Sequence, residues 1–466
     1  MPLLHQDRID ELLAHFHGNV IRPGDAEYDD ARQVWNGMID RRPSLIARCT
    51  SVDDVVEAVR FARRHNLLVS VRGGGHNIAG HAVCDDGLMI DLSRMRHVLV
   101  DPSARRATAE PGCTLAELDA ASQAHGLAVP LGINSTTGVA GLTLGGGFGW
   151  LSRMYGMTVD NLLSADVVTA DGSRIRANEQ ENADLFWGLR GGGGNFGIVT
   201  RFEFRLHPVG PDLLSGLIVF PFDQAKPVLT RFARFTETMP EELNVWMVTR
   251  KAPPLPFLPP TVHGKEIVAL ALCYGGKPAE GEWLIEPLRG FGTVVGEHVG
   301  VQPYTAWQQA FDPLLTRGAR NYWKSHNFTR LSEGAIDSII AYADRLPSPQ
   351  CEIFVGTVGG QTARVPADAM AYSSRDAQYV MNVHARWESP EQDGQCIAWA
   401  REFFARSQPF ASGGAYINFL TQDEAERTAF AYGPAYGRLV QLKRKYDPTN
   451  LFRMNQNISP RMGTVA

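Results

Sequence analysis

The sequence lacks three features, each of which would point to a particular class of protein. Its six cysteines form no Cys-x-x-Cys pair and there is no His-Glu-x-x-His run, so we expect reduced thiols and no bound metal. The 45 lysines and arginines against 50 acidic residues leave a formal net charge of −5, without the basic excess that nucleic acid would require. No stretch reaches the roughly 18 apolar residues of a membrane span, and the charged N-terminus is unlike a signal peptide. We therefore expect a cytoplasmic protein that binds neither membranes nor nucleic acid.

Glycine, in contrast, is abundant and is concentrated in clusters in the first half of the chain. The clusters are Gly73–Gly75, Gly145–Gly147 and Gly191–Gly194. Glycine lets the backbone approach a ligand closely, and successive N–H groups in such turns form an anion site that needs no basic side chain. The clusters are therefore either simple turns or loops that surround an extended anionic ligand such as a pyrophosphate.

Hydrophobic patterning changes near residue 210, which together with the chain length predicts two domains. Before this point short apolar strands alternate with helices, for example a helix over 52–64 followed by a strand over 67–71. Beyond it, an antiparallel sheet with helices on one face is predicted by long alternating strands at 244–250, 266–273, 351–355 and 378–387. The run Pro253–Pro260 contains a Pro-x-x-Pro sequence, which indicates either a stiff loop between two strands or a docking peptide.

A Gly-x-Gly-x-x-Gly sequence at Gly192, Gly194 and Gly197 matches the fingerprint of NAD-binding Rossmann folds. That fingerprint requires a strand before the glycines and a helix after them. Here residues 184–190 are predicted to be helical and residues 198–206 alternate like a strand. Because the order is reversed, we do not expect an NAD site of this kind.

Five motifs occur along the chain in an order that is far more specific than any one of them. They are Arg72-Gly-Gly-Gly-His76-Asn77, the glycine-rich run from Thr137 to Gly149, Asp160-Asn161, the run from Arg190 to Val199, and Lys445-Tyr-Asp-Pro-x-Asn450 with Arg453 to Asn457. From Trp35 to Pro460 the sequence resembles the FAD-linked oxidases of the berberine bridge enzyme type. These belong to the vanillyl-alcohol-oxidase superfamily and have a PCMH-type FAD-binding domain.

The resemblance implies an α+β fold of two domains, in which an antiparallel-sheet substrate domain splits the FAD-binding domain. We expect an N-terminal helical segment over 1–40 and the FAD-binding domain over 41–210. The α+β substrate domain would span 211–420, and a C-terminal segment over 421–466 would complete the FAD-binding domain.

The resemblance also assigns residues to the cofactor. His76 would carry FAD covalently as an 8α-histidyl flavin, a role that suits an imidazole because its neutral form, the nucleophilic one, is available near pH 7. The loop from Arg72 to Asn77 would surround the pyrophosphate, and Asn455 and Asn457 would bond the flavin ring. The complete set of expected FAD contacts is Trp35, Arg72, Gly73, Gly74, Gly75, His76, Asn77, Gly80, His81, Gly132, Thr136, Thr137, Gly138, Gly141, Leu142, Gly145, Gly147, Asp160, Asn161, Gly197, Ile198, Val199, Asn455 and Asn457.

Two departures from the family pattern bear on the chemistry. Many relatives attach the flavin a second time through a cysteine, but this sequence has Asn134 there, so a single covalent bond is expected. The tyrosine base of plant relatives is replaced by Phe419, and a glutamate that other relatives use falls at Ala369 in a looser alignment. The catalytic base is therefore not transferable, and strand alternation offers as candidates Lys324 (on one face with Tyr322 and His326), Tyr416 with Asn418, and His384.

We therefore expect a flavoenzyme that oxidises a small organic substrate, namely an amine, an activated alcohol or a phenol. Hydride would pass from the substrate to flavin N5, and oxygen would reoxidise the flavin. Without a transferable base, amines suit the enzyme better than sugars, whose hydroxyl proton must be removed. The alternatives are a flavoenzyme of secondary metabolism for oxidative cyclisation or oxygenation, and a protein that binds FAD or another nucleotide without turnover. The oligomeric state is not indicated.

We predict that NADH and NADPH do not reduce the bound flavin, because the strand and the helix around the Gly-x-Gly-x-x-Gly sequence stand in the wrong order. Under anaerobic conditions the visible absorbance of the flavin should stay unchanged with either nucleotide, whereas dithionite should bleach it. Rapid bleaching by NADH or NADPH would contradict this interpretation.

Overall fold

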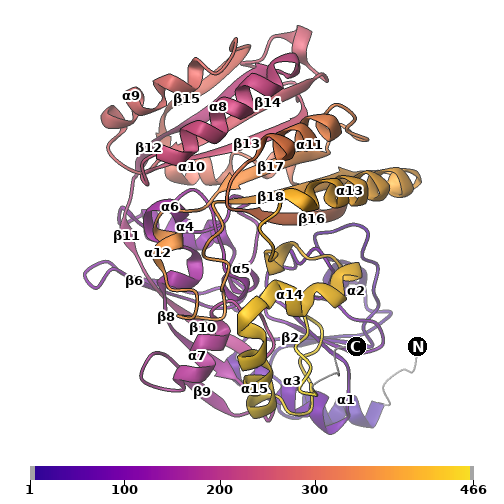
Figure 1. Cartoon of the computed structure of the whole chain (residues 1–466). Coiled ribbons are helices and arrows are strands. Elements are labelled where there is room, and N and C mark those ends of the chain that lie inside the picture. The colour runs from indigo at the N-terminus through magenta and orange to yellow at the C-terminus, as the bar shows by residue number, and fades with distance from the viewer. Residues whose placement is uncertain (1–5, 462–466) are drawn as a thin grey trace.

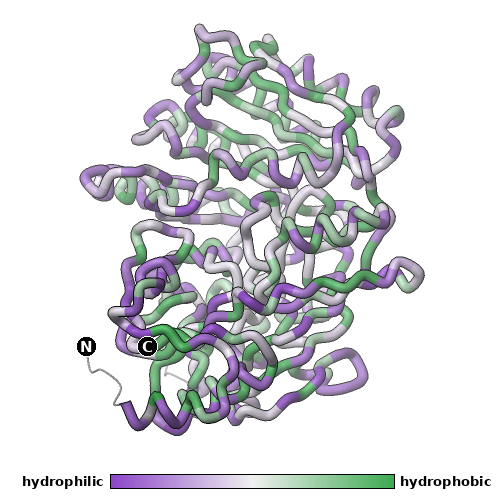
Figure 2. The backbone as a smooth tube through the Cα atoms, turned by 180° about the vertical axis from the view of Figure 1, so that it is seen from behind, coloured by the Kyte–Doolittle hydropathy of each residue, from purple (hydrophilic) through white to green (hydrophobic). Residues whose placement is uncertain are grey.

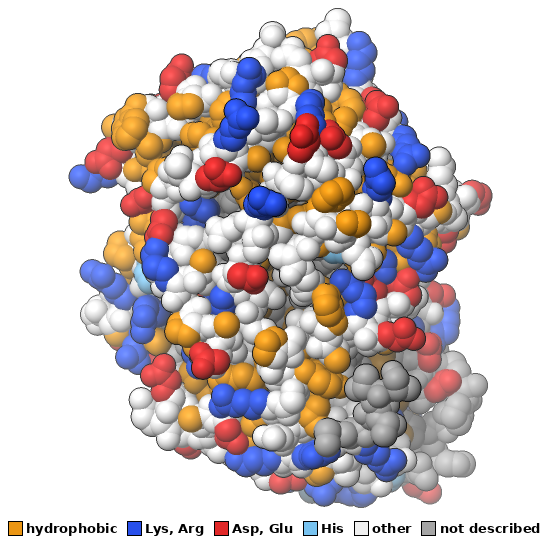
Figure 3. Space-filling model, viewed as in Figure 1, with side chains coloured by type: hydrophobic (Ala, Val, Ile, Leu, Met, Phe, Trp, Pro, Cys, Tyr) orange, Lys and Arg blue, Asp and Glu red, His pale blue; other side chains and the backbone are white. Residues whose placement is uncertain are grey.

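The computed structural model describes residues 6–461 and consists of two parts, which Figure 1 shows one above the other. The lower part contains the N-terminal half of the chain together with its C-terminal segment, and the upper part is built on one large sheet. No described helix is long and apolar enough to cross a membrane. On the face shown in Figure 3, basic and acidic side chains are interspersed over both parts.

The first sheet has the strand order β1-β2-β4-β3. The strands β2 (Leu45–Arg48), β4 (Leu88–Asp91) and β3 (Val69–Arg72) are parallel, and β1 (Asn19–Ile21) pairs with β2 in antiparallel orientation. The expected helical segment over 1–40 needs correction, because β1 lies between its helices α1 (Gln6–Leu13) and α2 (Tyr28–Arg32) and extends the sheet. Residues 1–5 of that segment lie outside the described residues.

The helix predicted over 52–64 is confirmed as α3 (Val52–Arg64). The hydroxyl of Ser51 accepts the N–H of Asp54, and the carboxylate of Asp54 accepts the N–H of Ser51, a reciprocal cap that fixes where the helix begins. The buried side of the helix, including Val55 and Val59, packs in one core with β2, β3 and β4. This packing fixes the end of β3, from which the first glycine loop and His76 follow.

A second, antiparallel sheet has the order β5-β6-β10-β8-β9. Its strands are β5 (Val98–Asp101), β6 (Arg106–Ala109), β10 (Ile198–Arg205), β8 (Leu162–Val168) and β9 (Arg174–Ala177). The sequence Asp171-Gly172 between two strand-like runs predicts a hairpin, and the structure confirms it: Gly172, at φ +80°, turns the chain between β8 and β9. The helix α7 (Ala183–Leu189) precedes the last glycine cluster and β10 follows it, so the reversed order is also confirmed.

Short elements connect these sheets and carry the other glycine clusters. They are α4 (Leu115–Gln123), β7 (Leu127–Ala128), α5 (Val139–Gly145), α6 (Ser152–Tyr155), the 3-10 helix η1 (Thr158–Asn161) and β11 (His207–Pro208). The strand β7 after α4 is short, and its residues Leu127 and Ala128 pair with β11.

The upper part is a seven-stranded sheet with the order β15-β12-β14-β13-β17-β18-β16, in which each pair is antiparallel. Its strands are β12 (Asp212–Pro221), β13 (Leu243–Lys251), β14 (Glu266–Tyr274), β15 (Gly296–Pro303), β16 (Arg320–Phe328), β17 (Glu352–Thr357) and β18 (Tyr379–Trp387). Its helices are α8 (Ala225–Thr238), α9 (Pro278–Arg289), α10 (Tyr304–Gln309), α11 (Glu333–Ala343) and α13 (Asp393–Ser407), whereas α12 (Gln361–Arg364) packs against α6 of the lower part. The 3-10 turns are η2 (Phe222–Gln224), η3 (Pro260–Val262), η4 (Asp312–Leu314), η5 (Pro390–Gln392) and η6 (Gln408–Phe410).

Helices α8, α9, α11 and α13 cover one face of this sheet, as predicted (Figure 1). Along β13, Val245 and Met247 belong to the core beneath these helices, whereas Trp246 belongs to the core shared with the lower part. The strands form a hydrophobic interior with hydrophilic loops around it (Figure 2). The α+β two-domain fold is thus confirmed, and one face of the sheet is left for the lower part.

After the upper part, the chain returns to the lower one. Its elements there are η7 (Ile417–Phe419), η8 (Gln422–Arg427), α14 (Thr428–Tyr432), η9 (Gly433–Ala435) and α15 (Tyr436–Tyr446). The yellow helix α15 lies against α7 in Figure 1, so the end of the chain packs beside the last glycine cluster.

A buried ion pair holds this C-terminal segment in place. The ammonium of Lys443 lies 2.7 Å from a carboxylate oxygen of Asp447, and neither side chain is exposed to solvent. The same ammonium donates to the carbonyl oxygens of Asn195 and Phe452, each at 2.8 Å, while Asp447 accepts the N–H groups of Leu451 and Phe452. One charged pair therefore joins α15, the last glycine loop and the C-terminal segment.

We predict that Lys443→Met destabilises the protein by about 3–5 kcal/mol, because it leaves Asp447 charged and unpaired in the core. The matched control is Lys445→Met in the same helix, whose ammonium pairs with Asp184 but is 59% exposed and should cost at most about 1 kcal/mol. Urea denaturation midpoints measure both. Equal midpoints for the two variants would show that the buried pair does not hold the segment.

Candidate active site

A large cavity lies between the glycine loops of the lower part and the open face of the seven-stranded sheet. It contains about 1920 Å³ of space, part of it open to solvent. Of the expected FAD contacts, those that line it are Trp35, Gly73, Gly74, Gly75, His76, Asn77, His81, Gly132, Thr137, Gly138, Gly141, Leu142, Gly197, Ile198, Val199 and Asn455. Of the catalytic candidates, Tyr416, Asn418 and His384 line it as well. Motifs far apart in the sequence therefore meet around one space.

Two glycines at the cavity wall touch backbone to backbone. A Cβ atom on Gly74 would lie 2.4 Å from the backbone nitrogen of Gly138, and one on Gly138 would lie 2.4 Å from that of Gly74. No side chain fits at either position without moving a backbone. The first glycine loop and the start of α5 are thus fixed against each other, and their backbone faces the cavity instead of side chains.

His76 follows the first glycine loop, and its ring stacks on Trp35 with 5.2 Å between ring centres. Burial, together with the positive charge of Arg317, lowers the pKa of His76 to about 3, so the imidazole is neutral at pH 7. A neutral imidazole keeps one nitrogen lone pair available as a nucleophile.

Neighbouring side chains decide which nitrogen that is. The Thr136 hydroxyl donates to the Asn134 side-chain oxygen at 2.7 Å, and this oxygen also accepts the N–H of Thr136. A hydroxyl has one proton, so its 2.9 Å contact with His76 Nε2 requires that Nε2 carries the hydrogen. The lone pair is therefore on Nδ1, whose contact with the Thr137 hydroxyl is longer, at 3.4 Å.

Tyr416 and Asn418 stand together at another wall. The Tyr416 hydroxyl accepts the N–H of Gly147 at 2.8 Å and the side-chain amide of Asn418 at 3.1 Å. Burial raises the pKa of Tyr416 to about 12 although both bonds oppose it, so the phenol keeps its proton at neutral pH. A Cβ atom on Gly145 would lie 2.2 Å from the Asn418 amide, which explains the glycine there. The strand predicted for this segment is wrong: its residues form the 3-10 turn η7.

His384 on β18 contacts Glu352 on β17 at the same cavity wall. His384 Nε2 lies 3.1 Å from the Asn321 side-chain oxygen, and Nδ1 lies 3.2 Å from a carboxylate oxygen of Glu352. The other carboxylate oxygen accepts from Arg250 at 2.8 Å. Burial opposes ionisation of Glu352, but Arg250 and His384 outweigh it and hold the pKa of Glu352 below its ordinary value. Burial lowers the pKa of His384, against the opposing effect of Glu352.

The rest of this wall is aromatic. Trp246 stacks on Phe354 with 5.6 Å between centres, and Phe419 contacts Phe354 and Tyr416 edge to face. Three polar groups in the wall have no hydrogen-bond partner: the amide of Asn382 and the indole nitrogens of Trp246 and Trp323. Buried polar groups normally have partners, so an unpaired set beside a cavity indicates ligand contacts.

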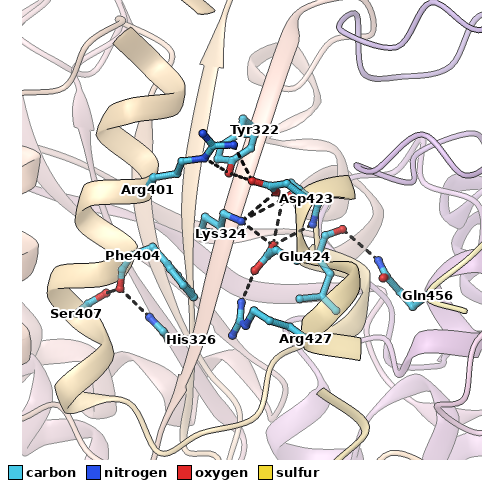
Figure 4. A network of polar contacts seen from close by, with 12 residues as sticks. Tyr322, Lys324, His326, Arg401, Phe404, Ser407, Asp423, Glu424, Arg427 and Gln456 are labelled. Carbon is cyan, nitrogen blue, oxygen red and sulfur yellow. Dashed lines mark hydrogen bonds and ion pairs between the residues drawn. The ribbon is translucent and has the colours of Figure 1, made fainter. Parts of the chain in front are cut away.

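Lys324 is not part of this site and is removed as a catalytic candidate. On β16 it pairs with Val383 of β18, so it points to the opposite face from Trp323 and His384. Its ammonium lies 3.1 Å from Asp423 and 3.3 Å from Glu424. Figure 4 shows this network, which Tyr322 of β16 and Arg401 of α13 join. His326, on the same face, donates its Nε2 hydrogen to the carbonyl oxygen of Phe404 and does not face the cavity.

Several expected FAD contacts also lie outside the cavity lining, namely Arg72, Gly80, Thr136, Gly145, Gly147, Asp160, Asn161 and Asn457. Asp160 forms two hydrogen bonds with the buried guanidinium of Arg375, and Asn161 bonds the carbonyls of Tyr155 and Met157. We therefore correct the role of Asp160 and Asn161 to one of holding the loops. Arg72 donates to the carbonyl of Ala31, behind the glycine loop.

The alignment that puts a glutamate of other relatives at Ala369 is also corrected. Ala369 does not line the cavity, and its carbonyl oxygen accepts a hydrogen bond from Arg190. Five residues that line the cavity from one face of four strands were not predicted from the sequence: Glu352, Asn382, Trp246, Trp323 and Phe354. A charged residue inside an otherwise apolar strand was the available signal for Glu352.

The described residues contain no group of three or more His, Cys, Asp or Glu side chains placed to hold a metal. All six cysteines are buried and unpaired, and none lines the cavity. Burial, with Glu117, raises the pKa of Cys113 to about 12.

A cavity lined by glycine loops and by a neutral histidine suits an enzyme that binds an extended cofactor. Comparisons with known proteins identify it. Residues 43–178 match the family model described as FAD binding domain, and residues 415–459 match the model described as berberine and berberine like.

The full chain is similar to several characterised oxidases. (R)-6-hydroxynicotine oxidase of Paenarthrobacter nicotinovorans is 33% identical over 95% of this chain and 97% of its own. The crystal structure of 6-hydroxy-D-nicotine oxidase from Arthrobacter nicotinovorans (29% identity, TM-score 0.85) covers 96% of this chain and 98% of that one. The xylooligosaccharide oxidase of Myceliophthora thermophila (26% identity, TM-score 0.85) covers 98% of this chain and all (100%) of its own. The chain belongs to the FAD-dependent oxidoreductases of the berberine bridge enzyme type.

The residues present fit FAD. The backbone contact of Gly74 with Gly138 leaves a wall without side chains, as a pyrophosphate requires, and Ile198 and Val199 supply an apolar wall further along. At the cavity edge, the side-chain oxygen of Asn455 has no partner within the protein, while its amide donates to Gly194 and Phe452.

We predict that stability falls as the pH drops below about 6.5, because several histidines are buried in the neutral form. Burial lowers the pKa of His76 to about 3 and that of His81, His207 and His326 to about 4. The unfolded chain, with pKa values near 6.5, then binds more protons, so the stabilisation is complete above pH 6.5 and is lost toward pH 4.

His326→Gln tests this away from the cavity. Its melting temperature should fall less between pH 7.5 and 5 than that of the wild type, since about one proton fewer is taken up on unfolding. Burial raises the pKa of Asp119 to about 7, so this group by itself makes the protein more stable as the pH falls. Its effect is the same in both proteins and cancels in the comparison. An identical pH dependence in the two proteins would refute the prediction.

Proposed function

We propose that FAD is attached to Nδ1 of His76 and that the protein oxidises a small organic substrate, an amine or an activated alcohol or phenol, with oxygen as electron acceptor. The observation that carries this proposal is the neutral His76 at the edge of the glycine-lined cavity, with its proton on Nε2. When bound, FAD accepts a hydride from the substrate at N5 and passes the electrons on. The neighbouring residues Asn134 and Thr136 then act as the groups that keep the imidazole in the nucleophilic tautomer.

One covalent bond is proposed instead of two. Asn134 stands where relatives have a second attachment residue, and its side-chain oxygen is used by Thr136. The nearest alternative thiol in the sequence, Cys113, lies outside the cavity lining and its high pKa keeps it protonated.

The choice of amines over sugars rests on the protonation states in the cavity. Tyr416 keeps its proton, so it can donate a hydrogen bond but cannot accept the proton of an alcohol. Phe419 beside it has no titratable group, and Lys324 points away. An amine needs no simultaneous proton removal, because its nitrogen lone pair stabilises the cation that hydride loss creates. The relative named for 6-hydroxynicotine supports this choice and the one named for xylooligosaccharide opposes it.

Oxidative cyclisation or oxygenation in secondary metabolism is the second candidate, and binding without turnover is the third. The cavity wall formed by the sheet contains the unpaired amide of Asn382, which is available to a substrate. This favours an enzyme over a carrier, that is, a protein that binds FAD without turnover. Anaerobic addition of a substrate separates turnover from binding alone, since a carrier stays coloured while an enzyme bleaches, and the identified product then separates simple oxidation from cyclisation or oxygenation.

We predict that His76→Ala loses covalent flavin, whereas His81→Asn, at another lining position, retains it. After acid precipitation, wild-type and His81→Asn pellets should be yellow and the His76→Ala pellet colourless. A map of flavin peptides should show one attachment, to histidine. Colour that washes out of the wild-type pellet, or a cysteinyl flavin in the map, would contradict the proposal.

A further inference from the structure

A second, smaller cavity continues from the first along the same face of the sheet. It contains about 730 Å³ of space, part of it open to solvent. Five residues line both cavities, Ile133, Trp246, Leu315, Glu352 and Phe354, so the two are adjacent. The sheet supplies the floor of the second cavity through small and branched side chains such as Val219, Val248 and Ala269.

The proline-rich run forms the other wall of this cavity. It joins β13 to β14, and its Leu255, Phe257 and Leu258 line the space. Leu258 is buried, the His263 ring bonds its carbonyl at 3.1 Å, and Phe257 stacks on His298. Proline restricts the backbone of such a loop, so the wall is already formed before a ligand binds. The stiff-loop interpretation of this run therefore fits its place in the fold.

Charged side chains occur only at one end of the second cavity's lining. They are Arg250 and Glu352, which pair with each other at 2.8 Å, and Glu352 stands at the junction of the two cavities. Each carboxylate oxygen has two acceptor positions, so after bonding Arg250 and His384 the group can still accept a hydrogen from a ligand.

We propose that the substrate is an arylalkylamine or alkylamine, whose N–H group donates to Glu352 and whose apolar group fills the second cavity. This inference rests on the proposed flavin chemistry and names its substrate class. A ligand that ends at the junction would leave an apolar cavity empty. A sugar would bury hydroxyl groups against Val219, Val248 and Ala269, which offer no hydrogen-bond partner. The unpaired indole nitrogens in this lining, of Trp150 and Trp246, supply only two donors, too few for a sugar.

The test uses the intact enzyme and a series of phenylalkylamines with one to four methylenes, with methylamine and cellobiose for comparison. Anaerobic calorimetry with the flavin reduced beforehand gives Kd without turnover, the same titration is possible on protein without flavin, and oxygen uptake gives turnover. Affinity should rise about fourfold per methylene until the cavity is filled. In the wild type, 3-phenylpropyl methyl ether, which has no N–H donor, should bind at least tenfold more weakly than 3-phenylpropylamine.

Two substitutions should move the series in opposite directions. Ala269→Leu fills the floor and should weaken binding of the longer amines at least tenfold without affecting methylamine. Phe257→Ala opens the loop wall and should shift the preferred chain by at least one methylene. Ala310→Leu, the same change as at position 269 but on an exposed residue, is the matched control and should leave the series unchanged.

Equal affinity along the series, an equal loss for short and long amines in Ala269→Leu, or tighter binding of cellobiose would overturn the inference. If those results come from protein whose pellet stays yellow after acid, only the substrate class is wrong. A colourless wild-type pellet, in contrast, would refute the proposed function, and the calorimetric series would still decide what the second cavity binds.

Discussion

The cavity depends on one buried ion pair, between Lys443 and Asp447. Their charges cannot remain unpaired in the core, and the remaining hydrogen-bond positions of both groups are taken by backbone from the glycine loop and from the last residues of the chain. The C-terminal segment must therefore return from the upper part and dock beside α7. Phe452 and Asn455, which line the cavity, and Gly194, which Asn455 bonds, are all placed by this return. A site assembled from both ends of a chain is thus held by a pair that itself never contacts a ligand.

The second constraint is the two-residue repeat of the seven-stranded sheet. Alternate residues face the helices or the cavity, so Ile353 and Val355 lie in the core while Glu352 and Phe354 line the cavity. A shift of one residue in the pairing of β17 would bury the carboxylate under α11 and α13 and turn isoleucine toward the ligand. The antiparallel register with β13 and β18, which pairs Glu352 with Arg250 and His384, therefore fixes both the fold and the polar end of the second cavity.

Local features of the sequence were predictable and the composition of the substrate wall was not. The helix over 52–64, the hairpin at Gly172 and the reversed order around Gly192 each depend on neighbours in the chain, and the structure confirms them. Family motifs likewise led to His76 and the loops. Lys324 and His384 both lie on alternating strands, but which face meets the lower part is set by packing between distant segments, so alternation could not separate them. For the same reason Asp160 could not be recognised as the partner of Arg375, 215 residues away.

Hydrogen bonds also decide what proton chemistry this site allows. Tyr416 keeps its phenolic proton, and Nε2 of His384 contacts the side-chain oxygen of Asn321. Neither residue therefore offers a free basic atom to a substrate. Glu352 is ionised but its pKa is low, which makes it a good acceptor of a hydrogen bond and a weak base. Such a set of groups suits the proposed amine, which is recognised through N–H and loses a hydride from carbon without simultaneous removal of a proton from its nitrogen. The same contacts that hold Glu352 in an apolar wall thus link the shape of the second cavity to the choice of an amine.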